Sequence, residues 1–175
     1  MGTVARTAAR IAACLVFALA LAAPAPAAPL RSGIAAFNRH NYNAAAVIFG
    51  PLAEIGNARA QSYLGFMYET GRGVPQDYLT AAYWYRRAAN QGEVNAQCRL
   101  GLLFDKGLGV TQDYIVAHKW LNLAAAHAPP ATREYYTHLR DALAAKMTRG
   151  EIGTARVLAL QWVAVRERPV VIAHP

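Results

Sequence analysis

The sequence predicts an all-α protein: a short right-handed solenoid of helix-turn-helix units, followed by two C-terminal capping helices. Three observations support this fold class. Alanine accounts for 38 of the 175 residues and β-branched runs are few, a composition that favours helix. The chain repeats itself at an offset of 36 residues, which is typical of stacked helical units. With 55% hydrophobic residues and only 2 cysteines, the composition excludes wholesale disorder and a disulfide-dense scaffold.

Residues 1–27 are predicted to be a secretory signal peptide. Two arginines precede an uncharged apolar run over 11–23, and Ala25 and Ala27 occupy the small-residue positions of a cleavage site. The run is shorter than the ~20 residues that a membrane-spanning helix needs. We therefore expect cleavage after Ala27 and export to the periplasm or the cell exterior, with an uncleaved anchor as the alternative. Cleavage would lower the net charge from +8 to +6 and leave Cys98 as the only cysteine.

The period is clearest between residues 60–89 and 96–125, which align without a gap and are identical at 14 of 30 positions. A mid-helix glycine allows a neighbouring helix to approach closely, and turn glycines then break the chain. An aspartate suits the start of the second helix, and a tryptophan recurs with alanines on one helical face, which predicts a core position. These paired residues are Gly65 and Gly101, Asp77 and Asp113, and Trp84 and Trp120.

The repeat region is predicted to span 28–128. A degenerate copy over 32–57 precedes the two clear copies, 58–93 and 94–128, because the residue pattern of the first clear copy recurs 36 positions earlier. Each unit should contain two helices. The expected helices are near 32–39, 43–55, 58–70, 77–90, 94–106 and 113–126.

Residues 129–167 are predicted to form a C-terminal helical cap, and 168–175 a loose tail. Helical spacing continues after Pro130 although the 36-residue period ends, and a capping box from Thr148 to Glu151 predicts a last helix over 150–166. The first cap helix should bury a stripe of Tyr135, Leu139, Leu143 and Met147. The second should direct Ile152, Ala155, Leu158, Ala159 and Trp162 inward.

The repeats resemble the Sel-one-like repeat, a relative of the tetratricopeptide repeat. The matching signature in the first clear copy is Ala60-Gln61, Leu64-Gly65, Tyr68, Gly71-x-Gly73-Val74, Gln76-Asp77-Tyr78, Ala81, Trp84-Tyr85, Ala88-Ala89 and Gln91-Gly92. The second copy repeats it with Phe104, Leu121 and Ala128 at three of these positions. The resemblance covers about 32–128 and implies a helical solenoid that mediates protein-protein interaction as an adaptor rather than an enzyme.

A partner should bind where the copies differ, because stacking uses the constant positions. On the first helix of each unit, the variable positions fall on one helical stripe. The first helices line the concave surface of such solenoids, and aromatic and arginine side chains are common interface anchors. We therefore predict a groove for a peptide segment of a partner; an ordinary solvated face with some inter-repeat packing is the alternative. The candidate residues are Arg59, Tyr63, Phe66, Arg99, Leu102 and Lys106.

Catalysis, cofactors and metals are not expected. The histidines do not have the spacing of a zinc site, and neither Ser32 nor Ser62 begins the Ser-x-x-Lys motif of β-lactam hydrolases, an activity with which some exported relatives of the repeat are associated. Glu69 and Asp105 should be solvated charges, and Cys98 a helix-packing residue. The alternatives are an envelope-associated hydrolase or enzyme accessory, and a self-assembling structural module.

The predicted partner is a protein or peptide of the bacterial envelope. Basic residues are distributed without a dense run and export is expected, so nucleic acid is not an expected partner. The positive charge of the mature chain favours at most a weak attraction to acidic surfaces.

Overall fold

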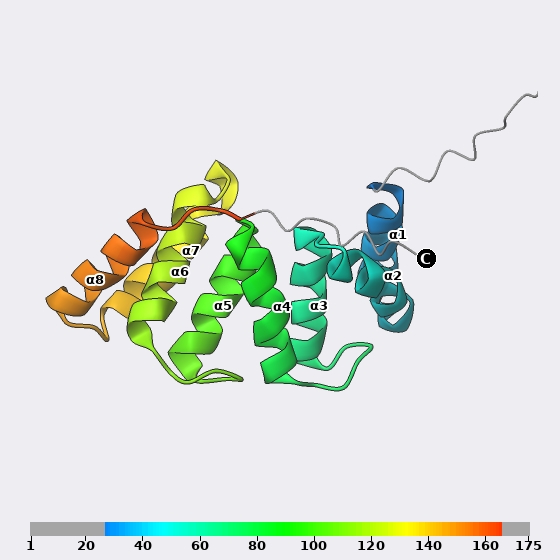
Figure 1. Cartoon of the computed structure of the whole chain (residues 1–175), viewed down its shortest axis with the longest axis horizontal. Coiled ribbons are helices and arrows are strands. Elements are labelled where there is room, and N and C mark those ends of the chain that lie inside the picture. The colour runs from blue at the N-terminus through cyan, green and yellow to red at the C-terminus, as the bar shows by residue number, and fades with distance from the viewer. Residues whose placement is uncertain (1–26, 166–175) are drawn as a thin grey trace, which may run out of the picture.

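The computed structural model of the chain describes residues 27–165, which form eight α-helices and no strand (Figure 1). The predicted all-α class is confirmed. The signal peptide and the tail after residue 167 lie outside the described residues, apart from Ala27. The helices are α1 (Ala27–Asn38), α2 (Tyr42–Glu54), α3 (Ala58–Thr70), α4 (Tyr78–Asn90), α5 (Val94–Lys106), α6 (Tyr114–His127), α7 (Pro130–Ala144) and α8 (Arg149–Leu160).

Side chains at the helix starts explain why the boundaries fall where they do. Asn57, Asp77, Glu93 and Asp113 each accept a hydrogen bond from a backbone N–H group in the first turn of the following helix. The expected helix limits between 43 and 127 agree with the structure to within one residue. The first helix is described from Ala27, earlier than expected. Pro29 is compatible with this start, because it lies in the first described turn, where a missing N–H group breaks no helical hydrogen bond.

The helices stack in sequential order, as Figure 1 shows. Helices α1 and α2, α3 and α4, and α5 and α6 form three antiparallel pairs, and the second helix of each pair packs on the first helix of the next element. The two cap helices depart from this pattern, since α7 and α8 each pack on α6 rather than on one another.

The repeated tryptophans lie in the core, as predicted. Trp84 is 7% exposed and Trp120 is 5% exposed, each within a cluster of buried alanine and leucine side chains. The repeated glycines also have a packing reason. A Cβ atom on Gly65 would lie 2.6 Å from the ring of Tyr85, so α3 and α4 can meet at this distance only without a side chain.

The turn between the two helices of the second clear repeat rests on the preceding repeat. Gly109 has a φ of 66°, and a side chain there would overlap the backbone of Tyr78 and Leu79 at the start of α4. Glycine thus supplies both the left-handed conformation and the space that the stacked units require.

The cap differs from the prediction in its details. The last helix ends at Leu160 rather than at 166, and Trp162 packs on Trp120 and His127 from the segment that follows. The Val165 N–H group donates to the Asn90 carbonyl at 2.8 Å, so the chain turns back toward α4 instead of extending α8. Leu158, expected to point inward, is exposed.

In α7, the buried tyrosine is Tyr136, whereas Tyr135 is 59% exposed. The predicted stripe was therefore wrong by one residue at its start. Tyr136, Leu139 and Leu143 follow the +3 and +4 spacing of one helical face, and Tyr135 falls outside that face. Within residues 27–165, no helix is both long and apolar enough to cross a membrane.

Candidate protein-binding site

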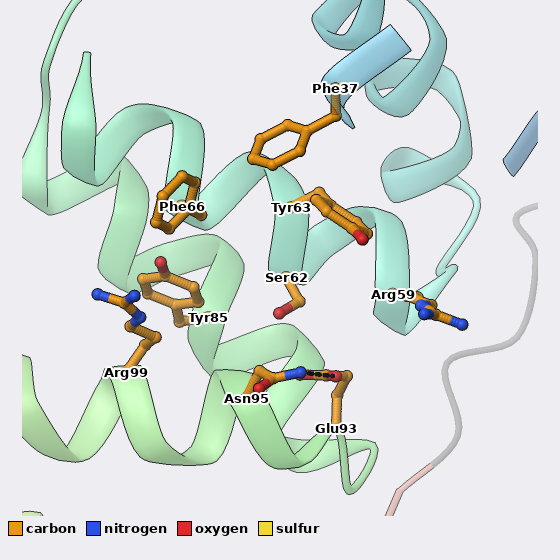
Figure 2. A pocket seen from close by; sticks show the side chains of 9 residues that line it. All are labelled: Phe37, Arg59, Ser62, Tyr63, Phe66, Tyr85, Glu93, Asn95 and Arg99. Carbon is orange, nitrogen blue, oxygen red and sulfur yellow. Dashed lines mark hydrogen bonds between the residues drawn. The ribbon is translucent and has the colours of Figure 1, made fainter. Parts of the chain in front are cut away.

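A pocket of about 250 Å³ opens between α1, α3 and α5 (Figure 2). It lies on the side of the solenoid formed by the first helices of the units, with one residue from α4 at its floor. The lining residues are Phe37, Arg59, Ser62, Tyr63, Phe66, Tyr85, Glu93, Asn95 and Arg99.

The structure brings together four of the six predicted binding residues. Arg59, Tyr63, Phe66 and Arg99 line the pocket, and Figure 2 shows Arg59 and Arg99 at opposite ends of it. The two remaining residues, Leu102 and Lys106, are not among the lining residues. That these residues bind a partner stays a prediction.

Leu102 and Lys106 lie on later turns of α5, beyond the residues that line the pocket. Leu102 packs against the cluster that contains Tyr136 and Leu143 of α7, and Lys106 is exposed at the C-terminal end of α5. The part of α5 that lines the pocket ends with Arg99, and Leu102, one turn further, packs on a cluster formed by residues of α5, α6 and α7. Sequence spacing placed these residues on one helical face but could not show which of them pack on this cluster.

The pattern of variable repeat positions did not indicate the other five lining residues. Ser62 and Tyr85 differ from their counterparts in the next repeat, Cys98 and Leu121, so the same comparison of copies could have identified them. Phe37 comes from the degenerate unit, whose first helix gave only a weak periodic signal. The remaining two, Glu93 and Asn95, lie at the N-terminus of α5.

One wall of the pocket is an aromatic cluster. The Phe37 ring meets the rings of Tyr63 and Phe66 edge to face, with centroid distances of 5.0 and 5.7 Å. Behind them, Phe49 stacks on Tyr63 at 4.7 Å, and Phe49 itself is fully buried. Edge-to-face and stacked ring pairs hold their members in defined orientations. The wall therefore presents a fixed apolar surface to the pocket.

Arg99 is held in place by a partly buried polar network. Its guanidinium contacts the Glu69 carboxylate at 3.3 Å and lies 5.2 Å from the centre of the Phe66 ring. The Tyr85 hydroxyl donates to the other oxygen of Glu69 at 2.6 Å. Burial and the neighbouring Glu69 charge both raise the pKa of Tyr85, so this hydroxyl keeps its proton and remains a donor.

The opposite wall is fixed by the start of α5. Glu93 accepts from the Ala96 N–H group at 2.6 Å and from the Asn95 side-chain amide at 3.3 Å. Asn95 also accepts from the Tyr136 hydroxyl at 2.7 Å. The Glu93 charge thus lies at a helix N-terminus, where the helix dipole stabilises it.

Glu69 and Asp105 do not have the solvated environment that the sequence suggested. Each is paired with a cation from a later element, Glu69 with Arg99 and Asp105 with Lys146 at 2.9 Å. The carboxylates are only 17% and 14% exposed. Stacking of units brings these cations to the ends of α3 and α5, which repeat spacing alone could not show.

Two other residues considered for chemistry lie in the core. Cys98 is buried against Tyr136 and has no disulfide partner among residues 27–165, and burial raises the pKa of its thiol to about 12. His118 is 1% exposed, and burial, Arg140 and Arg156 lower the pKa of its imidazole. Among residues 27–165, no group of three His, Cys, Asp or Glu side chains could hold a metal ion.

Comparison with known proteins identifies the repeated units. The Sel1 repeat family matches residues 58–93 and 94–128. A search of curated protein sequences gives no match.

Two solved structures are similar over most of this chain. A protective antigen present in uropathogenic Escherichia coli strains, which displays an SLR fold, is 29% identical over 82% of the chain, with a TM-score of 0.74. A Sel1 repeat protein from Oxalobacter formigenes is 26% identical over 78%, with a TM-score of 0.61. The chain spans 31% of the first protein and 55% of the second. Together with the two matched repeats, these structures show that the chain contains two Sel1 repeats and has the fold of Sel1-like repeat proteins.

Proposed function

We propose that this chain is a noncatalytic adaptor of the bacterial envelope that binds a segment of a partner protein in the pocket between α1, α3 and α5. Sel1 repeat proteins typically mediate protein-protein interaction and are typically non-catalytic. The observation that carries the proposal is the convergence of divergent repeat positions. Arg59, Tyr63, Phe66 and Arg99 differ between copies, and they surround one open pocket.

The chemistry of the pocket supports a peptide ligand. A rigid aromatic wall offers apolar contact area without further ordering of side chains, and arginine and tyrosine are frequent energetic anchors of interfaces. Glu93, the acidic residue of the pocket, and Tyr85, its buried tyrosine, are engaged in hydrogen bonds within the protein. These contacts favour binding over bond-breaking chemistry.

The test is partner retention by pocket variants of the mature chain. Tagged protein is used to recover interacting proteins from envelope extract, with and without the double substitution Tyr63→Ala and Arg99→Ala. Circular dichroism establishes that the variant remains helical. We expect the double variant to lose the partner, and unchanged retention would refute binding in the pocket.

A second pair of variants avoids any risk to folding. Arg59 is exposed, so Arg59→Glu should leave the fold intact and weaken retention by reversing a charge at the pocket edge. Lys106→Glu is the matched control, since Lys106 is exposed on α5 away from the pocket. An equal loss in both variants would indicate general charge attraction instead of a pocket.

The envelope location rests on the signal peptide predicted over residues 1–27. Cell fractionation, together with mass spectrometry of the mature N-terminus, tests it. Export predicts a mature chain that begins at Ala28 in the periplasmic or secreted fraction. A full-length chain in the cytoplasmic fraction would contradict the location without affecting the pocket.

A further inference from the structure

We propose that the pocket selects an extended segment in which one large apolar side chain is flanked on both sides by acidic residues. This inference rests on the proposed function, because it assigns a chemistry to the partner segment that the pocket binds. Its basis is the arrangement of aromatic rings and arginines around the pocket.

The size of the pocket suits a single side chain. Its volume of about 250 Å³ is below the roughly 300–1,000 Å³ of sites that enclose a whole small molecule. The apolar surface comes from Phe37, Tyr63 and Phe66, which contact one another. A large apolar side chain of the partner, aromatic or aliphatic, would therefore be the anchor.

Arginines lie at both ends of this aromatic wall. Arg59 lies at the N-terminal end of α3, as Figure 2 shows. Arg72 follows the C-terminal end of α3, outside the pocket lining but next to its Phe66 ring. Its guanidinium is 5.4 Å from the centres of both the Phe66 and Tyr42 rings and donates to the Tyr42 hydroxyl at 3.3 Å. Arg72 was not identified from the sequence, because it lies in a repeat turn.

Charge pairing within the described residues leaves these two arginines available. Arg99 is neutralised by Glu69, and the Glu93 charge is held at the N-terminus of α5. Neither Arg59 nor Arg72 has a carboxylate partner among residues 27–165. A ligand with carboxylates near both ends would supply the missing partners, whereas a ligand with basic ends would be repelled.

The separation of the two arginines fixes the spacing of the ligand. They are 13 positions apart along α3 and its C-terminal turn, or about 20 Å at the helical rise of roughly 1.5 Å per residue. An extended chain advances roughly 3.3 Å per residue, so about six residues cover this distance. The acidic residues should therefore be about six positions apart, with the apolar anchor between them.

The test uses three fluorescein-labelled peptides of roughly seven residues in a glycine-serine background. The first has aspartate at both ends and phenylalanine at the centre, the second replaces phenylalanine with alanine, and the third replaces both aspartates with lysine. Fluorescence anisotropy with the mature chain measures their affinities. We expect the first to bind at least about tenfold more tightly than the second, because a buried phenylalanine is lost, and the third not to bind.

Arginine substitutions show where the peptide binds. Arg59→Gln and Arg72→Gln should each weaken the first peptide by about two- to fivefold, the effect of losing one exposed ion pair. Arg86→Gln is the control, since Arg86 is an exposed arginine on α4 that does not line this pocket. Equal weakening by all three variants would show nonspecific attraction and overturn the inference.

Two further outcomes separate this inference from the proposed function. If no peptide binds, or the lysine peptide binds as well as the aspartate peptide, the ligand chemistry is wrong. If the Tyr63→Ala and Arg99→Ala double variant nevertheless loses its partner, the pocket still binds a protein, and only the acidic and apolar pattern is refuted.

Discussion

The two Sel1 repeats have the same core but differ on their concave side. Gln61 and Gln97 are buried at equivalent positions, and each donates its side-chain amide to the last turn of the preceding helix, to the carbonyls of Ala53 at 3.0 Å and Ala89 at 3.3 Å. The same contact therefore joins each repeat to the unit before it. Stacking is achieved by a repeated set of interactions.

Above that core, the repeats diverge. The first has the Tyr85, Glu69 and Arg99 network beside an open pocket. In the second, Leu121 replaces the tyrosine, and Tyr136 of α7 packs over Cys98 in the equivalent groove. The difference shows how a repeated scaffold acquires a single site: the change of a few side chains leaves one groove open and fills the next.

The largest expected effect tests the shared core. Trp84→Ala and Trp120→Ala should each lower the free energy of unfolding by about 3–5 kcal/mol, because both remove a large buried ring and leave a cavity. Urea denaturation followed by circular dichroism measures the change. A loss below about 1 kcal/mol in either variant would show that the repeats do not contribute equally to one core.

The next effect compares two polar contacts at equivalent repeat positions, Tyr85 with Glu69 and Lys146 with Asp105. Tyr85→Phe removes the hydroxyl that donates to Glu69 at 2.6 Å. It should lower the free energy of unfolding by about 1–3 kcal/mol, because a mostly buried carboxylate is left with one partner fewer. Lys146→Met removes the ammonium group that pairs with Asp105. Because Lys146 is exposed, the free energy of unfolding should fall by less than about 1 kcal/mol. Urea denaturation of both variants ranks them, and the reverse order would contradict the structural difference.

His118 gives the second repeat a pH dependence that the first lacks, since its counterpart is Ala82. Burial, followed by Arg140 and Arg156, lowers the pKa of His118 below its usual value of 6.5, although Asp141 opposes this shift. The unfolded chain then binds more protons than the folded chain. Stability contributed by the neutral imidazole is present above about pH 6.5 and is lost as pH falls below it, by up to about 1.4 kcal/mol per pH unit.

His118→Leu should remove this dependence. Leucine does not titrate, and it also replaces a buried Nδ1 atom that has no hydrogen-bond partner among the described residues. Urea denaturation at pH 7.5 and at acidic pH compares the variant with the unmodified chain. An identical fall in stability in both proteins would show that other groups cause it.

The sequence was a sufficient guide to the buried core and the helix limits where a residue had a counterpart 36 positions away. The burial of Trp84 and Trp120 and the limits of α3 and α5 could be predicted because two copies gave the same signal. The cap has no second copy, so Tyr135 was mistaken for the buried tyrosine and the last helix was extended beyond Leu160. Helical spacing alone did not show which of the adjacent residues Tyr135 and Tyr136 faces the core.

The candidate site was predictable in part for the same reason. Differences between the copies indicated Arg59, Tyr63, Phe66 and Arg99, which the structure brings to one pocket. They could not indicate that Leu102 packs on a cluster that includes Tyr136 and Leu143, because these two residues lie outside the repeat. Positions within a repeat define a surface, but the neighbouring element determines how much of it is open.

The smallest expected effect concerns Cys98, whose counterpart in the first repeat is Ser62. Both side chains are small and buried, so Cys98→Ser should change the free energy of unfolding by less than about 1.5 kcal/mol. Because the thiol pKa is raised to about 12, the folded chain should react with a thiol reagent at pH 8 far more slowly than the unfolded chain does in urea. Equal labelling rates in the two states would show that Tyr136 and α7 do not keep this groove closed, and that the second repeat is as open as the first.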